Sequence, residues 1–357
     1  MRIFLKILGW VAALAILAGA GYFIYQYFTA EEGAPAPAPG AQTPVETPIT
    51  ADGAIKTVSG NPVPDFWVNY KTGDIYFVKE DGKLAKAGAN GVDRELGGQF
   101  ITGFNRFIPS PDGTKAIAVI DYPYNPVFAV YDAANNTWER LPEGVFTATF
   151  DPSSSKIAYL NNRGLFVLDL NSKKSAEMMK LNIADGELRW SGVNDLFLIS
   201  EGVWYINPAQ KTIVNATGGE TGAAYNFNNK SYNALKFVRR GANDAALVFT
   251  HQIGGVIKEL PFKTLPSKCV FGEHTLYCAV PKNFPSRANL PDDYLKEKLY
   301  TEDVFVSYNL EEASDDFDII HQGEASIDAD HLAIKGKQLI FRNRYDGKLY
   351  SLDLKNR

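Results

Sequence analysis

Aromatic residues, polar turns and short β-rich runs recur along the chain in a regular order. Residues 107–119 read FIPSPDGTKAIAV, 150–160 read FDPSSSKIAYL and 190–200 read WSGVNDLFLIS. In each segment an aromatic residue precedes a cluster of turn-forming residues, and an apolar run of strand-forming residues follows. This pattern predicts short strands joined by tight turns, because helices would show a period of 3.6 residues.

The pattern extends to seven units at intervals that average about 44 residues. The anchor positions are Trp67, Phe107, Phe150, Trp190, Phe237, Cys269 and Leu332. Periods of 40–45 residues with four strands each are typical of propeller blades. The sequence therefore predicts an all-β, seven-bladed β-propeller over residues 54–357, and the regular spacing argues against a β-sandwich or two smaller β domains.

A second apolar run recurs as the expected third strand of the units. It ends on an Asp or Asn that can open the next turn. The clear examples are VFAVYD (127–132), LFVLDL (165–170), VWYIN (203–207), VFVSYN (304–309) and LYSLDL (349–354). GKLAKA (82–87) and GVIKEL (255–260) are interpreted as weak counterparts in units one and five.

The last unit ends without an outer strand, and a propeller must close its ring or expose an edge. The run AIKTVS, Ala54–Ser59, precedes the first anchor and reads as a short strand. We expect it to complete the last blade.

The N-terminal segment predicts membrane attachment. Residues 7–25 hold no charged side chain, and a bilayer-spanning helix needs about twenty such residues. Arg2 and Lys6 precede the segment, so the positive-inside rule places the N-terminus in the cytoplasm. We expect a cytoplasmic stub (1–6) and a transmembrane signal anchor (7–28). A signal peptide cleaved near Ala18-Gly19-Ala20 is the alternative.

A Pro- and Ala-rich linker is expected over residues 29–53, which include EEGAPAPAPG. Alternating Ala and Pro favour an extended polyproline II spacer, and a disordered tether remains the alternative. The expected localisation is the cell membrane, single-pass, with the propeller outside, in the periplasm or at the cell surface.

The two cysteines, Cys269 and Cys278, lie in the segment CVFGEHTLYC. If Glu273-His274 is a two-residue hairpin loop, the cysteines face each other as a non-hydrogen-bonded pair with close Cα atoms. An extracytoplasmic location makes oxidation plausible. We expect a disulfide, with two buried thiols as the alternative.

Composition and motifs narrow the classes of function. The formal net charge is −5 and no Lys/Arg-rich block occurs, so nucleic acid is not an expected partner. The four histidines fit no metal-binding motif, and hydrolase and nucleotide-binding signatures are absent. We therefore assign no catalytic, cofactor-binding or metal residues. The acidic run 311–318, EEASDDFD, reads as a solvated turn rather than a Ca²⁺ site.

The insertion at residues 281–303 interrupts the sixth unit between its second and third strands. Pro291-Asp292-Asp293 can start a helix, with acids near its N-terminus. The helix would carry an apolar stripe. The candidate partner-binding residues are Asp292, Asp293, Tyr294, Leu295, Leu299 and Tyr300. Either the helix packs on its own propeller, or it binds a partner, as inserted loops on rigid scaffolds often do.

The repeat units resemble the WD40-like repeats of TolB-type propellers, in which an aromatic-Ser-Pro-Asp-Gly turn precedes an apolar strand. Phe107 to Gly113 matches best, with Ile108-Pro109 inserted, whereas Asp151-Pro152 and Trp190-Ser191 match in part. The resemblance implies a propeller and no particular function. The anchor and tether also resemble those of uncharacterised membrane-anchored bacterial propeller proteins.

Two functions remain open. The first is a membrane-anchored extracytoplasmic scaffold that binds a protein or an envelope polymer. The alternative is an enzyme built at the propeller axis, of the lactonase, lyase or quinone-dependent dehydrogenase type. No set of ionisable residues in the sequence marks such a site, so we expect binding in preference to catalysis.

Overall fold

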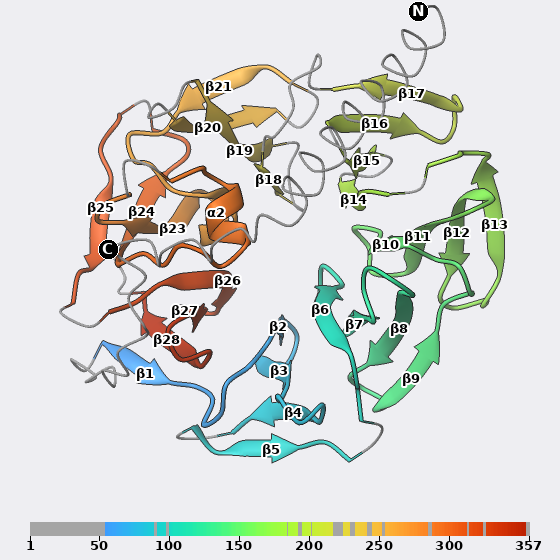
Figure 1. Ribbon diagram of the computed structural model, residues 1–357, viewed down its shortest axis with the longest axis horizontal. Coiled ribbons are helices and arrows are strands. Elements are labelled where there is room, and N and C mark those ends of the chain that lie inside the picture. The colour runs from blue at the N-terminus through green and yellow to red at the C-terminus, as the bar shows by residue number, and fades with distance from the viewer. Residues whose placement is uncertain are drawn as a thin grey trace, which may run out of the picture. The chain divides into compact units, whose positions relative to one another are not determined.

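Seven four-stranded antiparallel sheets make up the part of the protein that the structure describes. The computed structural model describes residues 54–354 except 89–90, 98–99, 184, 192–194, 201, 217–223, 229–232, 241–244, 252–253, 285–287, 313 and 324–325. The sheets stand around a common axis as the blades of a propeller (Figure 1). The predicted seven-bladed architecture is confirmed.

The first four blades follow one another along the chain, each an up-and-down meander from the axis outwards. Blade 1 comprises β2 (Phe66–Asn69), β3 (Asp74–Val78), β4 (Leu84–Ala87) and β5 (Asp93–Glu95). Blade 2 comprises β6 (Phe104–Pro109), β7 (Lys115–Ile120), β8 (Val127–Asp132) and β9 (Thr137–Arg140). Blade 3 comprises β10 (Thr147–Phe150), β11 (Lys156–Asn161), β12 (Gly164–Asp169) and β13 (Ser175–Met179). Blade 4 comprises β14 (Glu187–Ser191), β15 (Asp195–Ile199), β16 (Val203–Asn207) and β17 (Thr212–Asn215).

The remaining blades carry the insertion and the ring closure. Blade 5 comprises β18 (Ala224–Phe227), β19 (Asn233–Arg239), β20 (Ala245–His251) and β21 (Val256–Glu259). Blade 6 comprises β22 (Cys269–Phe271), β23 (Thr275–Pro281), β24 (Asp303–Asn309) and β25 (Asp318–His321), with the 3₁₀ turn η2 (Pro266–Lys268) before it and α2 (Asp292–Leu295) between β23 and β24. Blade 7 comprises β26 (Ala329–Lys335), β27 (Gln338–Asn343), β28 (Leu349–Asp353) and β1 (Ile55–Thr57).

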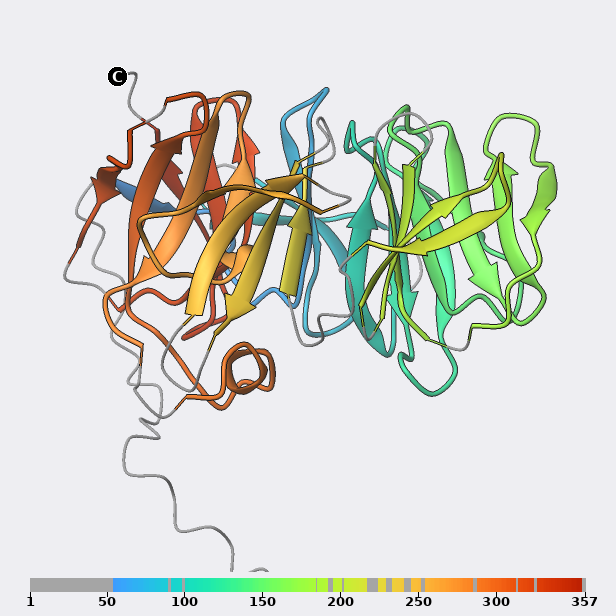
Figure 2. The same ribbon diagram turned by 90° about the horizontal axis from the view of Figure 1, so that it is seen from above.

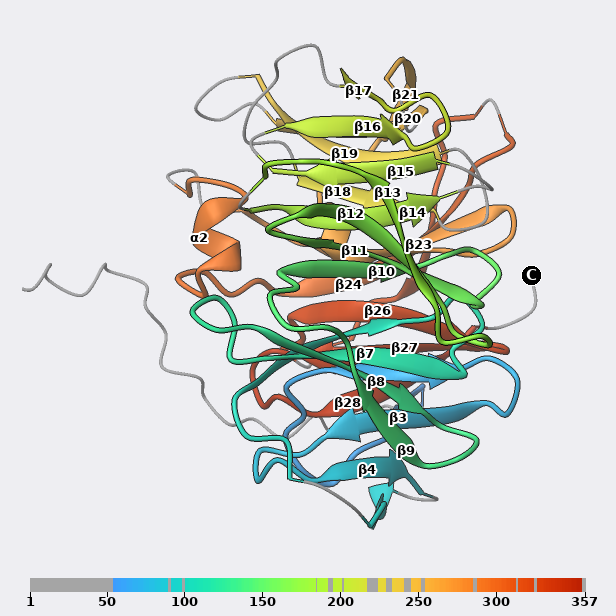
Figure 3. The same cartoon turned by 90° about the vertical axis from the view of Figure 1, so that its right-hand side faces the viewer.

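The ring has two unlike faces because every blade runs in the same sense. We call the face at which each innermost strand begins the entry face. It carries the connections between blades and those between second and third strands, and α2 lies on it (Figures 2 and 3). The opposite face carries the turns between first and second strands and between third and fourth strands.

The ring closes as predicted, because β1 supplies the outer strand of blade 7. Ile55, Lys56 and Thr57 pair with Leu352, Ser351 and Tyr350 of β28. Beyond the strand, the Leu349 N–H donates to the Ser59 hydroxyl at 2.9 Å. Ile55 is 2% exposed and belongs to the same apolar cluster as Phe341 and Leu352. The closure therefore joins the two ends of the propeller chain through both hydrogen bonds and apolar contact.

Anchor residues of the repeat fill the space between blades. Trp67 of blade 1 packs against Phe107 of blade 2 at 4.5 Å and against Tyr131 at 5.9 Å between ring centroids. The Trp67 indole N–H donates to the Gly113 carbonyl at 3.1 Å. Gly113 has φ +69°, and a Cβ there would lie 2.0 Å from the Val68 carbonyl oxygen. The Asp-Gly turn of the repeat therefore needs glycine for its close approach to the neighbouring blade.

The disulfide between Cys269 and Cys278 is present, with Cα atoms 4.1 Å apart. The hairpin register is the predicted one, since Cys269 pairs with Cys278 across β22 and β23. The Gly272 N–H donates to the Thr275 carbonyl at 2.7 Å around the two-residue loop. Both cysteines lie in the apolar core of blades 5 and 6.

The sequence analysis placed the strands of the fifth unit one position too early in the blade: it took the second strand for the first and the fourth strand for the third. Phe237 lies in β19, the second strand, and residues 256–259 form β21, the fourth strand. The innermost strand β18 is only four residues long and includes the polar Asn226. Its amphipathic signal is therefore weaker than that of β19, which was taken for the first strand. The true third strand is β20.

The predicted stub (1–6), transmembrane anchor (7–28) and linker (29–53) lie outside the described residues, which start at Ala54. Among the described residues, no helix is both long and apolar enough to span a bilayer.

Candidate functional site: the entry face of blades 6 and 7

The insertion that the sequence singled out is a long connection on the entry face. It joins β23 to β24 and holds α2, whose first turn contains Asp292 and Asp293 as predicted. The helix is a single turn, because Glu297 adopts a left-handed conformation with φ 57° soon after it. The predicted apolar stripe is therefore shorter on the helix than its spacing indicated.

Tyr294 fixes the insertion to the propeller. Its ring lies between two cations, with the Lys268 Nζ atom 4.7 Å and the Arg344 Cζ atom 4.1 Å from the ring centroid. Its hydroxyl donates to Asp328 at 2.9 Å. The residue is only 4% exposed. Such cation–π contacts gain strength where the cations are desolvated.

The cations belong to a buried ionic cluster, here the anchor cluster, which consists of Lys268, Asp303, Asp328, Tyr294 and Arg344. Lys268 donates to Asp303 at 2.6 Å and to Asp328 at 2.7 Å, and all three side chains are fully buried. Arg344 donates to the second oxygen of Asp328 at 2.9 Å. Two cations thus face two carboxylates, so the cluster buries no net formal charge.

The anchor cluster spans two blades and leaves few polar atoms without partners. Lys268 also donates to the Ala329 carbonyl at 2.9 Å, and the Thr301 hydroxyl donates to Asp303 at 2.9 Å. Burial alone would lower the pKa of Lys268, but Asp303, Tyr294 and Asp328 outweigh burial and raise it. Lys268 therefore stays charged at physiological pH.

The other predicted insertion residues divide between the propeller and solvent. Tyr300 lies over the Arg344 guanidinium at 4.8 Å and stacks on Tyr345 at 5.5 Å. The Leu299 carbonyl accepts a hydrogen bond from Arg344 at 3.1 Å.

Leu295 is 61% exposed. Among the described residues, the Asp292 side chain pairs only with the exposed Lys296, and Asp293 accepts from the Asn289 N–H at 2.7 Å. The insertion thus packs on its own propeller through its tyrosines while presenting Leu295 and Asp292 outwards.

A second network joins the ring closure beside the axis and was not identified from the sequence. The His331 Nδ1 atom of blade 7 lies 3.1 Å from the Asp65 carboxylate, which precedes blade 1. Asp65 also accepts the Phe107 N–H of blade 2 at 2.6 Å. Next to His331, Asp330 binds the Arg342 guanidinium through two hydrogen bonds of 2.8 and 2.6 Å.

His331 occupies an unusual backbone position, with φ 47° at an irregularity in β26. Its side chain is 44% exposed, whereas that of Asp65 is 8% exposed. Burial would lower the pKa of His331, but the Asp65 carboxylate outweighs burial and raises it. The only signal in the sequence for this network was an acidic residue placed directly before or within an innermost strand. Asp328 occupies the same kind of position.

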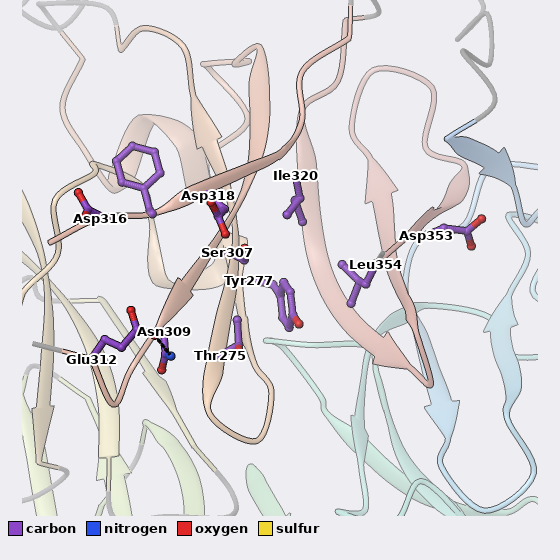
Figure 4. A pocket seen from close by; sticks show the side chains of 11 residues that line it. Thr275, Tyr277, Ser307, Asn309, Glu312, Asp316, Asp318, Ile320, Asp353 and Leu354 are labelled. Carbon is purple, nitrogen blue, oxygen red and sulfur yellow. Dashed lines mark hydrogen bonds between the residues drawn. The ribbon is translucent and has the colours of Figure 1, made fainter. Parts of the chain in front are cut away.

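An acidic groove of about 470 Å³ opens between blades 6 and 7 on the opposite face (Figure 4). Tyr277 and Ile320 come from blade 6, whereas Asp353 and Leu354 come from blade 7. Its carboxylates have partners within the protein: Glu312 accepts from Asn309 at 2.7 Å, Asp316 from Ser314 at 2.6 Å and Asp353 from Lys56 at 2.7 Å.

The described residues of the acidic run 311–318 connect β24 to β25, as expected of a turn between strands. Across the part of the chain that the structure describes, no three His, Cys, Asp or Glu side chains gather as a metal site would require.

Comparisons with known proteins identify similar solved structures, which share the fold of this chain at low sequence identity. No family model and no curated protein matches the chain. Oligogalacturonate lyase in complex with manganese matches with a TM-score of 0.56 and 12% identity over 85% of this chain and 91% of that chain. The Cps50 (Swd1) β-propeller domain of Myceliophteria thermophila matches with a TM-score of 0.54 and 9% identity over 84% of this chain and 100% of that chain.

The tricorn protease matches with a TM-score of 0.52 and 12% identity over 82% of this chain. This chain spans about a third, 34%, of the tricorn chain. TolB from Acinetobacter baumannii is also among the matching structures. The seven four-stranded sheets and the matches with TM-scores above 0.5 show that the protein is a β-propeller, and the expected WD40-like propeller architecture is confirmed at the level of the fold.

Proposed function

We propose that the protein is a membrane-anchored, extracytoplasmic propeller scaffold that binds a protein or envelope-polymer partner through the insertion on its entry face. The anchor is the apolar segment 7–28, the tether is the linker 29–53, and the propeller lies outside the membrane. The uncharged run 7–25 after Arg2 and Lys6 supports this orientation.

One observation carries the proposal: the insertion is fixed to the propeller at Tyr294, while the next residue faces solvent. Tyr294 is locked between Lys268 and Arg344, yet Leu295, the next residue, is 61% exposed. A rigid recognition element loses little conformational entropy when a partner binds. Inserted loops on stable scaffolds are common places for recognition.

The proposal is tested by cross-linking in intact cells with the full chain. The variant Leu295→Asp should lower the amount of cross-linked partner at least about tenfold, because an exposed apolar contact is replaced by a charge. The matched control is Val256→Asp, an exposed apolar residue (69%) on β21. Equal yields for both variants and the wild type would contradict the role of the insertion.

The membrane topology is tested separately. Protease added outside intact spheroplasts should release a propeller fragment whose N-terminus lies within residues 29–53. Protection of the whole chain until the membrane is permeabilised would show that the proposed orientation is wrong.

A second candidate, an enzyme at the propeller axis, is favoured by the pair of Asp65 and His331. A buried carboxylate that orients a partly exposed imidazole is a common arrangement for proton transfer. Lactone hydrolysis and uronate elimination would be assayed with the wild type and His331→Gln. Activity that is absent from the variant would favour this candidate over the scaffold.

A further inference from the structure

A hollow of about 380 Å³ opens beside blade 2, near the connection that arrives from blade 1. Its walls come from the segment before β6 and from the entry-face ends of β7, β8 and β9. The residues that line the walls are Phe100, Ile101, Thr102, Ile120, Asp121, Val127, Ala129, Trp138 and Arg140. The volume lies within the range of about 300–1,000 Å³ typical of binding pockets.

The walls of the hollow combine apolar side chains with polar groups, and two of the polar groups are charged side chains without a partner among the described residues. Arg140 is exposed at the end of β9, and Asp121 follows β7. Neither side chain has an ion-pair or hydrogen-bond partner among the described residues. The Asp121 carboxylate lies over Gly103, where a Cβ would come within 1.9 Å of its Oδ1 atom. An apolar wall with a few convergent polar groups is the usual design of a ligand site.

Exposed aromatic side chains occur in the wall of the hollow and in the chain segment next to it: Phe100 lines the hollow, and Tyr122 and Tyr124 follow the lining residue Asp121 in the connection to β8. Phe100 is 62% exposed, Tyr122 45% and Tyr124 97%. Lys83 lies 5.9 Å from the Phe100 ring centroid, and the Arg106 guanidinium lies 5.6 Å from that of Tyr122. Aromatic residues and arginine are enriched in interfaces and at their energetic centres. Three exposed aromatics beside one hollow therefore indicate a docking surface rather than scattered surface residues.

From this arrangement we infer that the hollow binds a peptide segment of a partner protein, with an apolar side chain in the hollow and an adjacent carboxylate on Arg140. A backbone N–H of the peptide would be accepted by Asp121. The inference concerns a second surface, separate from the insertion at blades 6 and 7.

The walls favour a peptide over a sugar. Ile120, Val127 and Ala129 present aliphatic surface, and Thr102 supplies the one hydroxyl among the described lining residues. A sugar hydroxyl that lies against these aliphatic walls would lose its hydrogen bonds to water without a replacement, which costs free energy. An aliphatic or aromatic side chain has no such groups to satisfy.

The inference is tested by selecting a phage-displayed library of random peptides against the purified full chain. Enriched sequences should place a large apolar residue next to Asp or Glu. A synthetic peptide of the enriched sequence, measured by fluorescence anisotropy, should bind Arg140→Glu at least about tenfold more weakly than wild type. Arg163→Glu is the matched control, because Arg163 faces the Phe166 ring in blade 3 and does not line the hollow.

Leu295→Asp should leave peptide binding unchanged, which separates this surface from the one proposed above. Enriched peptides without the apolar–acidic pairing, or equal weakening by Arg140→Glu and Arg163→Glu, would overturn the inference. The inference would also be overturned if the selection enriched no peptide and the protein instead bound polygalacturonate, an acidic polysaccharide probe, in a manner that depends on Arg140.

Discussion

Blades 6 and 7 are neighbours, and each is stabilised internally by a different kind of link. Blade 7 is completed by β1, a three-residue strand whose partner residues lie almost 300 positions later in the chain, for example Ile55 and Leu352. Blade 6 contains the one disulfide bond, which joins Cys269 to Cys278 over a separation of nine residues. The first contact is non-covalent and long-range, whereas the second is covalent and local.

This comparison indicates that sequence separation matters more than bond strength in a ring. A bridge over a loop of about ten residues removes little freedom from the unfolded chain, at most about 3 kcal/mol. The closure strand instead decides whether the sheet of blade 7 has an exposed edge, and it buries Ile55 in the core. The following variants are expected to have progressively smaller effects.

Removal of the closure strand should have the largest effect. Deleting residues 54–60 exposes β28 and removes Ile55 from its apolar cluster, so we expect a loss of more than about 5 kcal/mol in unfolding free energy, and aggregation. Thermal melting and light scattering measure both effects. Deleting residues 35–48 of the linker is the control and should change neither. Equal melting temperatures for the two deletions would contradict the importance of closure.

Breaking the anchor cluster tests a link between blades 6 and 7, in contrast to the closure strand and the disulfide, each of which lies within one blade. In Lys268→Met the carboxylates of Asp303 and Asp328 lose a fully buried cation, which should cost about 3–5 kcal/mol. Chemical denaturation measures the change. Lys282→Met is the control, because its 3.7 Å pair with Glu302 is solvent-exposed and worth about 0–1 kcal/mol. A loss below about 1 kcal/mol for Lys268→Met would show that the cluster is not stabilising.

Loss of the disulfide should have a smaller effect. Cys278→Ser should leave a folded propeller whose unfolding free energy is lower by no more than about 3 kcal/mol, since the loop is short. Melting temperature with and without reductant measures this, and Ser307→Ala in the same groove-facing sheet serves as a control. A variant that fails to fold would reverse the ranking of closure strand and disulfide.

The smallest expected effect is a pH dependence at the closure. The pKa of His331 is raised above 6.5 by Asp65, so its contribution to stability is fully present below about pH 6.5 and is lost as pH rises through the raised pKa. Unfolding experiments between pH 5.5 and 8.5 should show this decline in the wild type. In His331→Gln the decline should be absent. Parallel pH profiles for the two proteins would show that the pair does not contribute.

Much of the architecture could be predicted from the sequence because it depends on local patterns. Trp67 and Phe107 precede their turns at the repeat spacing, and the Cys269–Cys278 hairpin follows from a two-residue loop. Blade 5 could not be placed correctly, since β18 is short and includes the polar Asn226, whereas the longer β19 gave the stronger pattern. Local amphipathicity is a weaker guide where a strand gains its stability from neighbouring blades.

The functional surfaces were predicted less well. The insertion was identified because it lengthens one repeat, but its spacing did not reveal that Tyr294 is buried and Leu295 exposed. The side chains that contact the Tyr294 ring belong to Lys268, well before Tyr294 in the sequence, and to Arg344, well after it. No local pattern connects such positions.

The sequence by itself determined the repeat, the number of blades, the closing strand and the disulfide, because strand period, turn chemistry and spacing are properties of short segments. Only the tertiary structure decided which polar residues meet: Lys268 with Asp303 and Asp328, and His331 with Asp65, whereas Arg140 meets no acid among the described residues. The physical reason is that charges interact through space and depend on burial. The ring brings together residues that are far apart in the chain.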